Sequence, residues 1–322
     1  MRRFDGADVQ RALTAVRPYV RLTPLEESFY LNRDGRRYFF KLECLQRARS
    51  FKIRGAVNKM LSLTEAQRTA GVGTVSSGNH GSSVAYAAQM LGIANAAVIV
   101  PEPTPQSKVD KIEYFGGRAL RMGRDYDEAH ALGMAYIAEH GLTYIDAYYD
   151  DPLIYAGQGT VALEILRQNP EIDTIVVPVG GGGLITGIAV AAKSVKPDVR
   201  IVGVQTEACP AMVRSYADGV CYEEYPSAPS LCDALLGGIG RLSYEMAKDY
   251  VDDLLTVSEP DIARAVSFMA RQEKFIAEAG SCTTVAAVQH CAERIGGKQV
   301  ALVISGGNID GDVLARVLAE NP

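Results

Sequence analysis

Short runs of β-branched residues alternate with amphipathic stretches along almost the whole of this 322-residue chain. This alternation is typical of βα units, because parallel strands must be joined by long crossovers that are usually helices. We therefore predict an α/β fold with parallel-rich twisted sheets flanked by helices. The predicted strands are Tyr38–Leu42, Gly73–Val75, Ala96–Val100, Arg118–Met122, Thr143–Asp146, Thr174–Pro178, Arg200–Val204, Leu254–Val257 and Gln299–Ile304.

Helices are expected between these strands, and several have recognisable ends. Thr104 is expected to be an N-cap with Pro105 at the first helical position, where proline is favoured. Glycine follows two other predicted helices, as is common at helix C-termini. The remaining predicted helices are Gly81–Leu91, Tyr126–His140 and Asp310–Glu320.

The length and composition of the chain limit the class of protein to which it can belong. At about 150 residues per domain, a chain of 322 residues suggests two domains. Hydrophobic residues make up 48% and charged residues 22%, which excludes a disordered or fibrous chain. The 33 Lys and Arg residues against 38 Asp and Glu give a net charge of −5, without a basic run. We therefore expect neither a nucleic-acid partner nor a membrane partner.

The cysteine pattern indicates a reducing compartment. The cysteines stand at positions 44, 209, 221, 232, 282 and 291, and no pair has the C-x-x-C spacing of a zinc or redox site. The N-terminal residues meet an acid and polar residues at once, without an apolar stretch of the signal-peptide type. We therefore expect reduced thiols in a cytoplasmic protein.

Four consecutive glycines, Gly180–Gly183, stand between a predicted buried strand and a predicted helix. Glycines expose backbone N–H groups without Cβ obstruction, and with the positive end of a helix dipole they suit a phosphate group. The dinucleotide pattern G-x-G-x-x-G fails, because Ile185 or Thr186 occupies the third glycine position. The alternative is a glycine turn that holds no ligand.

A second loop between a strand and a helix runs from Ser76 to Gly81. Its hydroxyl and amide groups precede an Ala-rich helix, where the helix N-terminus could hold a carboxylate. The alternative is simple capping of the helix, and a lone histidine such as His80 more often packs or caps than catalyses.

Two further motifs each offer one chemically useful side chain. Lys52 lies between Phe51 and Ile53, and apolar surroundings would lower the pKa of its amine and make it a nucleophile or base. Taken alone, it is as readily a surface lysine beside Arg54. Ser305 opens a Ser-Gly-Gly-Asn loop after the last predicted strand and could place a hydroxyl toward a ligand ring, although such turns are commonplace.

Together and in this order, these motifs resemble the fold-type II pyridoxal-phosphate enzymes, in particular the serine/threonine dehydratase and serine racemase branch. The resemblance spans roughly residues 20 to 310. The matching stretches are Leu22–Leu25, Ser50–Ala56, Ser76–Gly81, Val109–Ile112, Ala156–Thr160, Gly180–Leu184 and Ser305–Asn308. The resemblance implies a two-domain architecture similar to that of the tryptophan synthase β subunit. Residues 1–54 and 148–322 would form the large domain that binds pyridoxal 5′-phosphate, and residues 55–147 the small domain.

The resemblance also implies a role for each motif. Lys52 would bind the cofactor through a Schiff base and act as the catalytic base, Phe51 would pack beside the ring, and Asn79 would hydrogen-bond the ring hydroxyl. Ser305 would meet the pyridine nitrogen. The phosphate would be held by Gly180, Gly181, Gly182, Gly183 and Leu184. The substrate carboxylate would be held by Ser76, Ser77, Gly78, Asn79 and His80.

The sequence departs from this family at two places. Members that bind a divalent cation carry carboxylates where this chain has Gln205 and Ala211, so we expect no metal there, with Glu207 as the nearby carboxylate that could compensate. Changes also occur at Cys232-Asp233-Ala234 and at Glu278-Ala279-Gly280, where side-chain specificity would be set.

The resemblance implies an ammonia-lyase that converts a small β-hydroxy amino acid, such as L-threonine, L-serine or 3-hydroxyaspartate, to a 2-oxo acid and ammonia. The alternative is an amino-acid racemase of the serine or aspartate type with side dehydratase activity, for which Ser77 would be the second catalytic residue. A regulatory protein that keeps the fold without turnover is disfavoured, because all of the motifs are intact. We also expect a homodimer or higher homo-oligomer.

Overall fold

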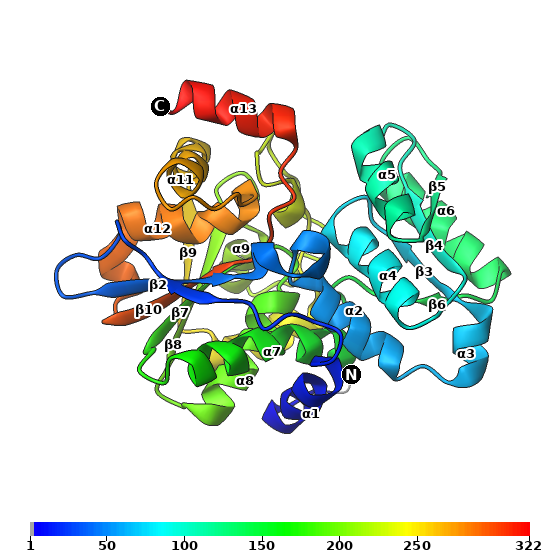
Figure 1. Cartoon of the computed structure of the whole chain (residues 1–322), viewed down its shortest axis with the longest axis horizontal. Coiled ribbons are helices and arrows are strands. Elements are labelled where there is room, and N and C mark those ends of the chain that lie inside the picture. Colours follow the sequence, from blue (N-terminus) through cyan, green and yellow to red (C-terminus); the bar gives the residue numbers. More distant parts are fainter. Residues whose placement is uncertain (1–2) are drawn as a thin grey trace.

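The computed structural model describes residues 3–322 and divides them between two sheets, each flanked by helices. Figure 1 shows them as two lobes: a large lobe around the six-stranded sheet and a small lobe around the four-stranded sheet. The strands of the large lobe, in spatial order, are β1 (Leu25–Glu27), β2 (Arg37–Leu42), β10 (Gln299–Ile304), β7 (Thr174–Pro178), β8 (Arg200–Thr206) and β9 (Asp253–Val257). Those of the small lobe are β5 (Arg118–Arg121), β4 (Ala96–Val100), β3 (Val72–Val75) and β6 (Thr143–Tyr144).

All strand pairs are parallel except the pair formed by β1, which lies antiparallel to β2 at the edge of the large sheet. The predicted parallel α/β fold is therefore confirmed. Strand β1 was not predicted, because three residues are too short for a recognisable alternation. The pair formed by β2 and β10 joins distant parts of the chain, since Gln299 pairs with Arg37 and Ile304 with Leu42.

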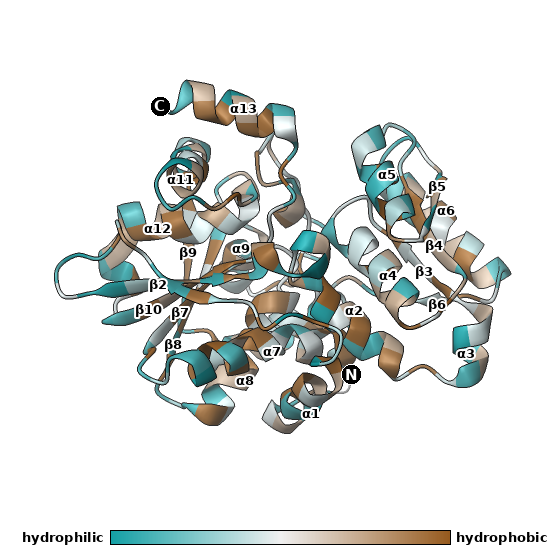
Figure 2. Cartoon of the chain, viewed as in Figure 1, coloured by the Kyte–Doolittle hydropathy of each residue, from teal (hydrophilic) through white to brown (hydrophobic). Residues whose placement is uncertain are grey.

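Helices cover both faces of the large sheet, so its strands are apolar on both sides. Ile175 and Val177 of β7 pack in one core, while Val176 between them packs in the other. The first core includes side chains of helices α1 (Gly6–Val16), α7 (Pro152–Gln168) and α8 (Gly183–Val195). The second includes side chains of α11 (Glu259–Arg271), α12 (Ala279–Ile295) and α13 (Gly311–Glu320). Figure 2 shows many of the most hydrophobic segments on the strands and on the helix stretches beside them.

The remaining helices connect or cover the lobes. Helix α2 (Lys52–Leu61) packs against both α7 of the large lobe and α4 (Asn79–Met90) of the small lobe. The others are α3 (Glu65–Ala70), α5 (Gln106–Tyr114), α6 (Tyr126–Glu139), α9 (Ala211–Asp218) and α10 (Arg241–Tyr250), with short 3₁₀ turns at Glu43–Leu45, Arg47–Arg49 and Asp233–Leu235.

The predicted elements agree with the structure to within a few residues, with one wrong assignment. Pro105 is the N-cap of α5, not its first helical residue, and Thr104 lies before the cap. The reason is that Pro105 has an extended ψ of 141°, so the helix begins at Gln106. Helix α4 begins at Asn79, two residues before the predicted start, because Gly78 serves as its N-cap.

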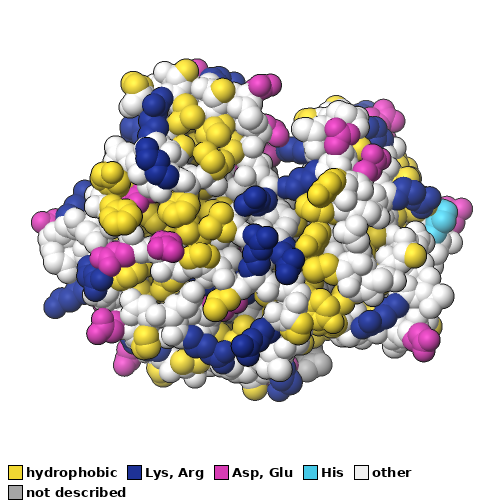
Figure 3. All heavy atoms as spheres, viewed as in Figure 1, with side chains coloured by type: hydrophobic (Ala, Val, Ile, Leu, Met, Phe, Trp, Pro, Cys, Tyr) yellow, Lys and Arg dark blue, Asp and Glu magenta, His cyan; other side chains and the backbone are white. Residues whose placement is uncertain are grey.

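Figure 3 shows a notch between the lobes at the top of the view, with Lys and Arg side chains gathered along their junction. The two sheets lie within the ranges predicted for the large and small domains, whose boundaries stay a prediction. Within residues 3–322, no helix is both long enough and apolar enough to span a lipid bilayer. Self-association and cytoplasmic location stay predictions.

Candidate active site

A cavity of about 1070 Å³ is lined by residues of both lobes and contains every site residue predicted from the sequence. Phe51, Lys52, the Gly180–Leu184 loop and Ser305 come from the large lobe, and Ser76–His80 from the small lobe. The Gly180–Leu184 loop, Ser305 and the Ser76–His80 loop each follow the carboxyl end of a parallel strand, where α/β sheets hold their ligands. The backbone N–H of Phe51 donates to the carbonyl oxygen of Ser305 at 3.0 Å, which ties the lysine turn to the end of β10.

Lys52 is the first residue of α2 and its side chain is partly buried in this cavity. Burial lowers the pKa of its ammonium group to about 8, although the negative charges of Asp146 and Glu278 oppose this shift. Its Nζ donates to the carbonyl oxygen of Ala147 at 3.1 Å and lies 5.5 Å from the ring centre of Phe51. Near neutral pH a usable fraction of this amine is therefore unprotonated, as a nucleophile or base requires.

The glycine loop joins β7 to α8 and leaves the helix N-terminus without a capping side chain. Gly182 has a φ of 92°, and a Cβ there would lie 2.0 Å from Ser243 Oγ. A Cβ on Gly181 would lie 2.0 Å from the Tyr148 ring, so this position also excludes a larger residue. The exposed N–H groups and the helix dipole together make a cradle for an anion.

The loop from Ser76 to His80 presents a second helix N-terminus to the cavity from the small lobe. Gly78, the N-cap of α4, provides no capping side chain. The imidazole of His80 is buried and donates through Nε2 to the carbonyl oxygen of Ile145 at 3.0 Å. Burial and the charge of Lys52 lower its pKa to about 4, so the ring is neutral at pH 7. Its predicted contact with substrate stays a prediction.

Ser305 brings a neutral hydroxyl to the cavity. Its Oγ lies 3.0 Å from Ser281 Oγ, and the Ser281 hydroxyl also donates to the carbonyl oxygen of Gly306 at 2.8 Å. A ligand ring nitrogen beside Ser305 would therefore be hydrogen-bonded by a neutral hydroxyl, which is itself paired with the hydroxyl of Ser281, and not by a carboxylate.

Several lining residues were not predicted as site residues, among them Lys111, Tyr148, Glu278 and Asn308. Lys111 and Asn308 fall in stretches that matched the family, and Glu278 was noted only as a place of departure. Tyr148 gave no sequence signal, because its proximity to Gly181 and to Lys52, 5.6 Å from its ring centre, arises only from the folding of the chain.

Beneath the lysine turn lies a buried ionic cluster that anchors α2. The Arg54 guanidinium donates to both oxygens of Glu43, at 2.7 and 2.8 Å, and to both oxygens of Glu164, at 2.7 and 2.8 Å. Lys41 Nζ completes the cluster through Glu164 at 2.7 Å. Arg54 is two residues after Lys52, so this cluster fixes the first turn of α2.

At the predicted metal-free position, Gln205 is buried and its amide oxygen accepts from the backbone N–H groups of Met212 and Val213 at 2.9 and 3.0 Å. Gln205 thus serves the first turn of α9. The absence of a metal at this place stays a prediction.

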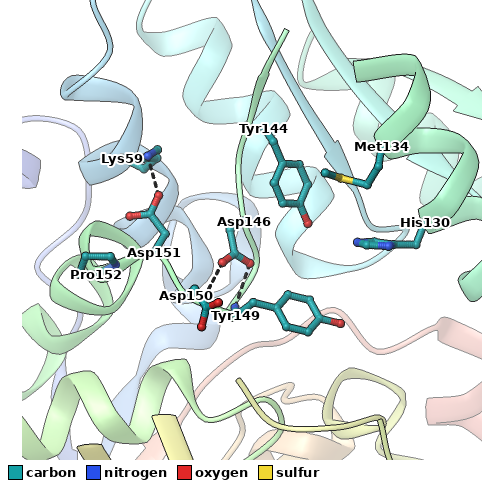
Figure 4. A pocket seen from close by; sticks show the side chains of 9 residues that line it. All are labelled: Lys59, His130, Met134, Tyr144, Asp146, Tyr149, Asp150, Asp151 and Pro152. Atoms are coloured by element: carbon teal, nitrogen blue, oxygen red, sulfur yellow. Dashed lines mark hydrogen bonds and ion pairs between the residues drawn. The ribbon is translucent and has the colours of Figure 1, made fainter. Parts of the chain in front are cut away.

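A second, more open hollow of about 590 Å³ is lined by Tyr144, Asp146 and Tyr149 together with residues of α2, α6 and the start of α7 (Figure 4). It includes Asp146, whose carboxylate accepts from the backbone N–H groups of Tyr148 and Tyr149 at 2.9 Å and of Asp150 at 2.8 Å. These bonds fix the turn, and the turn places the Ala147 carbonyl where Lys52 reaches it. Tyr149 lines both the hollow and the cavity.

The chain is similar to known enzymes over nearly its whole length. A family model described as "Pyridoxal-phosphate dependent enzyme" matches residues 16–306. An L-threonine ammonia-lyase of Thermotoga maritima is 40% identical to this chain, and the match covers 97% of this chain and 77% of the relative. A serine racemase of Arabidopsis thaliana is 36% identical, and the match covers 95% of this chain and 93% of the relative. The structure of maize serine racemase superposes with a TM-score of 0.89 at 33% identity, covering 98% of this chain and 97% of the other.

The fold and the cavity define a two-lobed α/β enzyme of fold type II, with a partly buried lysine and a glycine loop in the same cavity. The chain belongs to the pyridoxal-phosphate dependent enzymes.

The residues present fit this cofactor. Positions 181 and 182 leave no room for a Cβ, the α8 N-terminus is uncapped, and the Lys52 amine has a lowered pKa. The Gly180–Leu184 loop would hold the phosphate, Lys52 would bind the cofactor covalently, and Ser305 would meet its ring nitrogen. These individual roles stay predictions.

Proposed function

We propose that this enzyme is an ammonia-lyase that converts a small β-hydroxy amino acid, L-threonine, L-serine or 3-hydroxyaspartate, to a 2-oxo acid and ammonia. The observation that carries the proposal is that Lys52, Ser305 and the Ser76–His80 loop line one cavity. Relatives named L-threonine ammonia-lyase and L-threonine dehydratase support the same reaction class.

The chain's own residues would divide the chemistry as follows. Pyridoxal phosphate, when bound, supplies an electron sink at the substrate α-carbon. The uncapped N-terminus of α4 would hold the substrate carboxylate, since backbone N–H groups there lack helical acceptors. Lys52 Nζ would take the α-proton, and the β-hydroxyl would leave as water once protonated. Hydrolysis of the dehydrated product then takes up water, so the net products are the 2-oxo acid and ammonia.

Ser305 favours elimination over a long-lived carbanion. A neutral hydroxyl does not stabilise a protonated ring nitrogen as a carboxylate would, so the ring withdraws electrons less strongly. Prompt loss of the β-hydroxyl suits this weaker electron sink.

The decisive assay follows 2-oxo acid formation from L-threonine, L-serine and 3-hydroxyaspartate by the cofactor-loaded enzyme. Turnover of at least one of them supports an ammonia-lyase. Failure with all three, in protein that carries the cofactor, would exclude the proposed reaction.

A second candidate function, amino-acid racemisation, is favoured by Ser77. This serine lines the same cavity as Lys52 but comes from the opposite lobe. Inversion requires an acid or base on each face of the α-carbon, whereas elimination needs one base. The alternative for Ser77 is a hydrogen bond to the substrate carboxylate.

Ser77→Ala separates these two roles. If Ser77 returns the proton, inversion should fall by about 10²–10⁴-fold while elimination of the L-substrate changes little. If Ser77 only binds the carboxylate, both activities should fall together, and racemisation loses its structural support. Ser83→Ala is the matched control, because Ser83 is a buried serine of the same helix that does not line the cavity.

A further inference from the structure

Glu278 is a buried carboxylate at the cavity wall that the proposed reaction does not use. It is 7% exposed and occupies the N-cap of α12. Its two oxygens accept from Asn79 Nδ2 at 2.8 and 3.0 Å, and one also accepts from the backbone N–H of Asn308 at 3.2 Å. A Cβ on Gly306 would lie 2.6 Å from this carboxylate, so glycine at that position leaves room for it.

Glu278 ends a chain of side-chain hydrogen bonds that all run in one direction. Lys111 Nζ donates to Asn308 Oδ1, Asn308 Nδ2 donates to Asn79 Oδ1 at 2.5 Å, and Asn79 Nδ2 donates to Glu278. An ammonium group can only donate and a carboxylate can only accept, so the two ends fix the direction of both amides. A flipped Asn79 would place its carbonyl oxygen against the carboxylate and its NH2 group against that of Asn308.

This orientation decides what Asn79 offers to a ligand. An amide nitrogen carries two hydrogens, and both acceptor oxygens belong to one carboxylate, so one hydrogen serves Glu278. The second hydrogen remains for a ligand in the cavity that Asn79 lines. The same amide held the other way would present a carbonyl oxygen there.

We propose that Glu278 is a positioning residue that holds the Asn79 amide with its N–H toward the ring oxygen of the cofactor. The inference rests on the proposed function in one respect, that Asn79 hydrogen-bonds the cofactor ring as the family resemblance implies, but not on the identity of the substrate. Glu278 therefore acts on cofactor binding through Asn79.

A double-mutant cycle on the cofactor-loaded enzyme tests this relation. Glu278→Gln should raise the dissociation constant of pyridoxal phosphate about tenfold and alter its visible absorbance. The hydrogen bond from Asn79 loses its charge assistance, and a glutamine amide, which can also donate, no longer fixes the direction of the Asn79 amide. In an Asn79→Ala background the same substitution should change the dissociation constant by less than about twofold, since the intermediary is absent. Equal effects in both backgrounds, or no effect in either, would overturn the proposal.

Glu273→Gln is the matched control, because Glu273 is another buried carboxylate and does not line the cavity. It should leave the dissociation constant and the spectrum unchanged. If Glu278→Gln does not fold, Glu278→Asp replaces it in the cycle and should still lose its effect when Asn79 is absent.

The cycle is read without substrate, so its outcome is independent of the ammonia-lyase assay. Coupling between Glu278 and Asn79 in an enzyme that turns over none of the proposed substrates would refute the function alone. Turnover without coupling would refute the positioning role alone.

Discussion

Replacing Arg54 with methionine should destabilise the protein strongly although the substitution removes no apolar contact surface. Arg54 is fully buried and neutralises two carboxylates, those of Glu43 and Glu164. In Arg54→Met, Glu164 keeps its ion pair with Lys41 at 2.7 Å, but Glu43 loses its ion pair and keeps the hydrogen bond from the Thr23 hydroxyl at 2.5 Å and the more distant charge of Lys41. Leaving one buried charge without its partner costs about 3–5 kcal/mol, so we expect that loss in the free energy of unfolding at pH 7.

The loss should depend on pH in a defined direction. Burial raises the pKa of Glu43, but Arg54, with smaller contributions from the charge of Lys41 and the hydroxyl of Thr23, outweighs burial and holds this pKa below the usual value of 4.5. A lowered folded pKa contributes stability above the unfolded pKa, and this contribution disappears as the pH falls through the folded pKa. In Arg54→Met burial is no longer outweighed, so the pKa of Glu43 rises and protonation relieves the charge. The gap between variant and parent should therefore narrow as the pH falls from 7 toward 4.5.

Urea unfolding followed by circular dichroism, at several pH values and with cofactor bound throughout, measures this gap. The control is Arg11→Met, which breaks an exposed pair with Asp8 and should cost no more than about 1 kcal/mol. A loss below about 1 kcal/mol for Arg54→Met, or a gap that does not change with pH, would contradict the reasoning.

Two further predictions concern the cofactor site. Gly182→Ala should weaken cofactor binding more than about tenfold and destabilise the protein by about 1–3 kcal/mol, because φ is 92° and the new Cβ would clash with Ser243. Cofactor titration and thermal unfolding measure these two effects. The control is Gly311→Ala, which should change neither quantity, because its Cβ would meet nothing within 4 Å. The rate at which pyridoxal phosphate attaches covalently to Lys52 should rise with pH through about 8, the lowered pKa of Lys52, since only the neutral amine attacks. A rate that does not change between about pH 7 and 9 would count against Lys52. So would a borohydride-reduced adduct that mass spectrometry finds on another lysine.

The elements that can be predicted most accurately from the sequence are those whose ends are set by local chemistry. The strands Ala96–Val100, Thr174–Pro178 and Gln299–Ile304 were predicted with the bounds observed, because each is an apolar run between breakers. Pro105 was misplaced by one residue, since proline is compatible with both the N-cap and the first helical position, and ψ decides between them.

The candidate site likewise has features that can be predicted from the sequence and features that depend on the folded chain. The place of the Gly180–Gly183 loop, between a buried strand and an uncapped helix N-terminus, could be predicted from sequence, because consecutive glycines act on the local backbone; its binding of an anion stays a prediction. The lowered pKa of Lys52 was expected from its apolar neighbours. Its opposing charges, Asp146 and Glu278, are distant in sequence and were not expected.

Patterns along the chain were thus enough to predict the strands other than β1, the glycine loop, the position of Lys52 and the family. The directed hydrogen-bond chain of Glu278, Asn79, Asn308 and Lys111 arises only when the two lobes are folded together. Asn308 follows β10 and Glu278 begins α12 in the large lobe, while Asn79 of α4 and Lys111 of α5 reach them from the small lobe. Hydrogen-bond direction depends on which groups meet across these lobes, and no local pattern in the chain encodes that meeting.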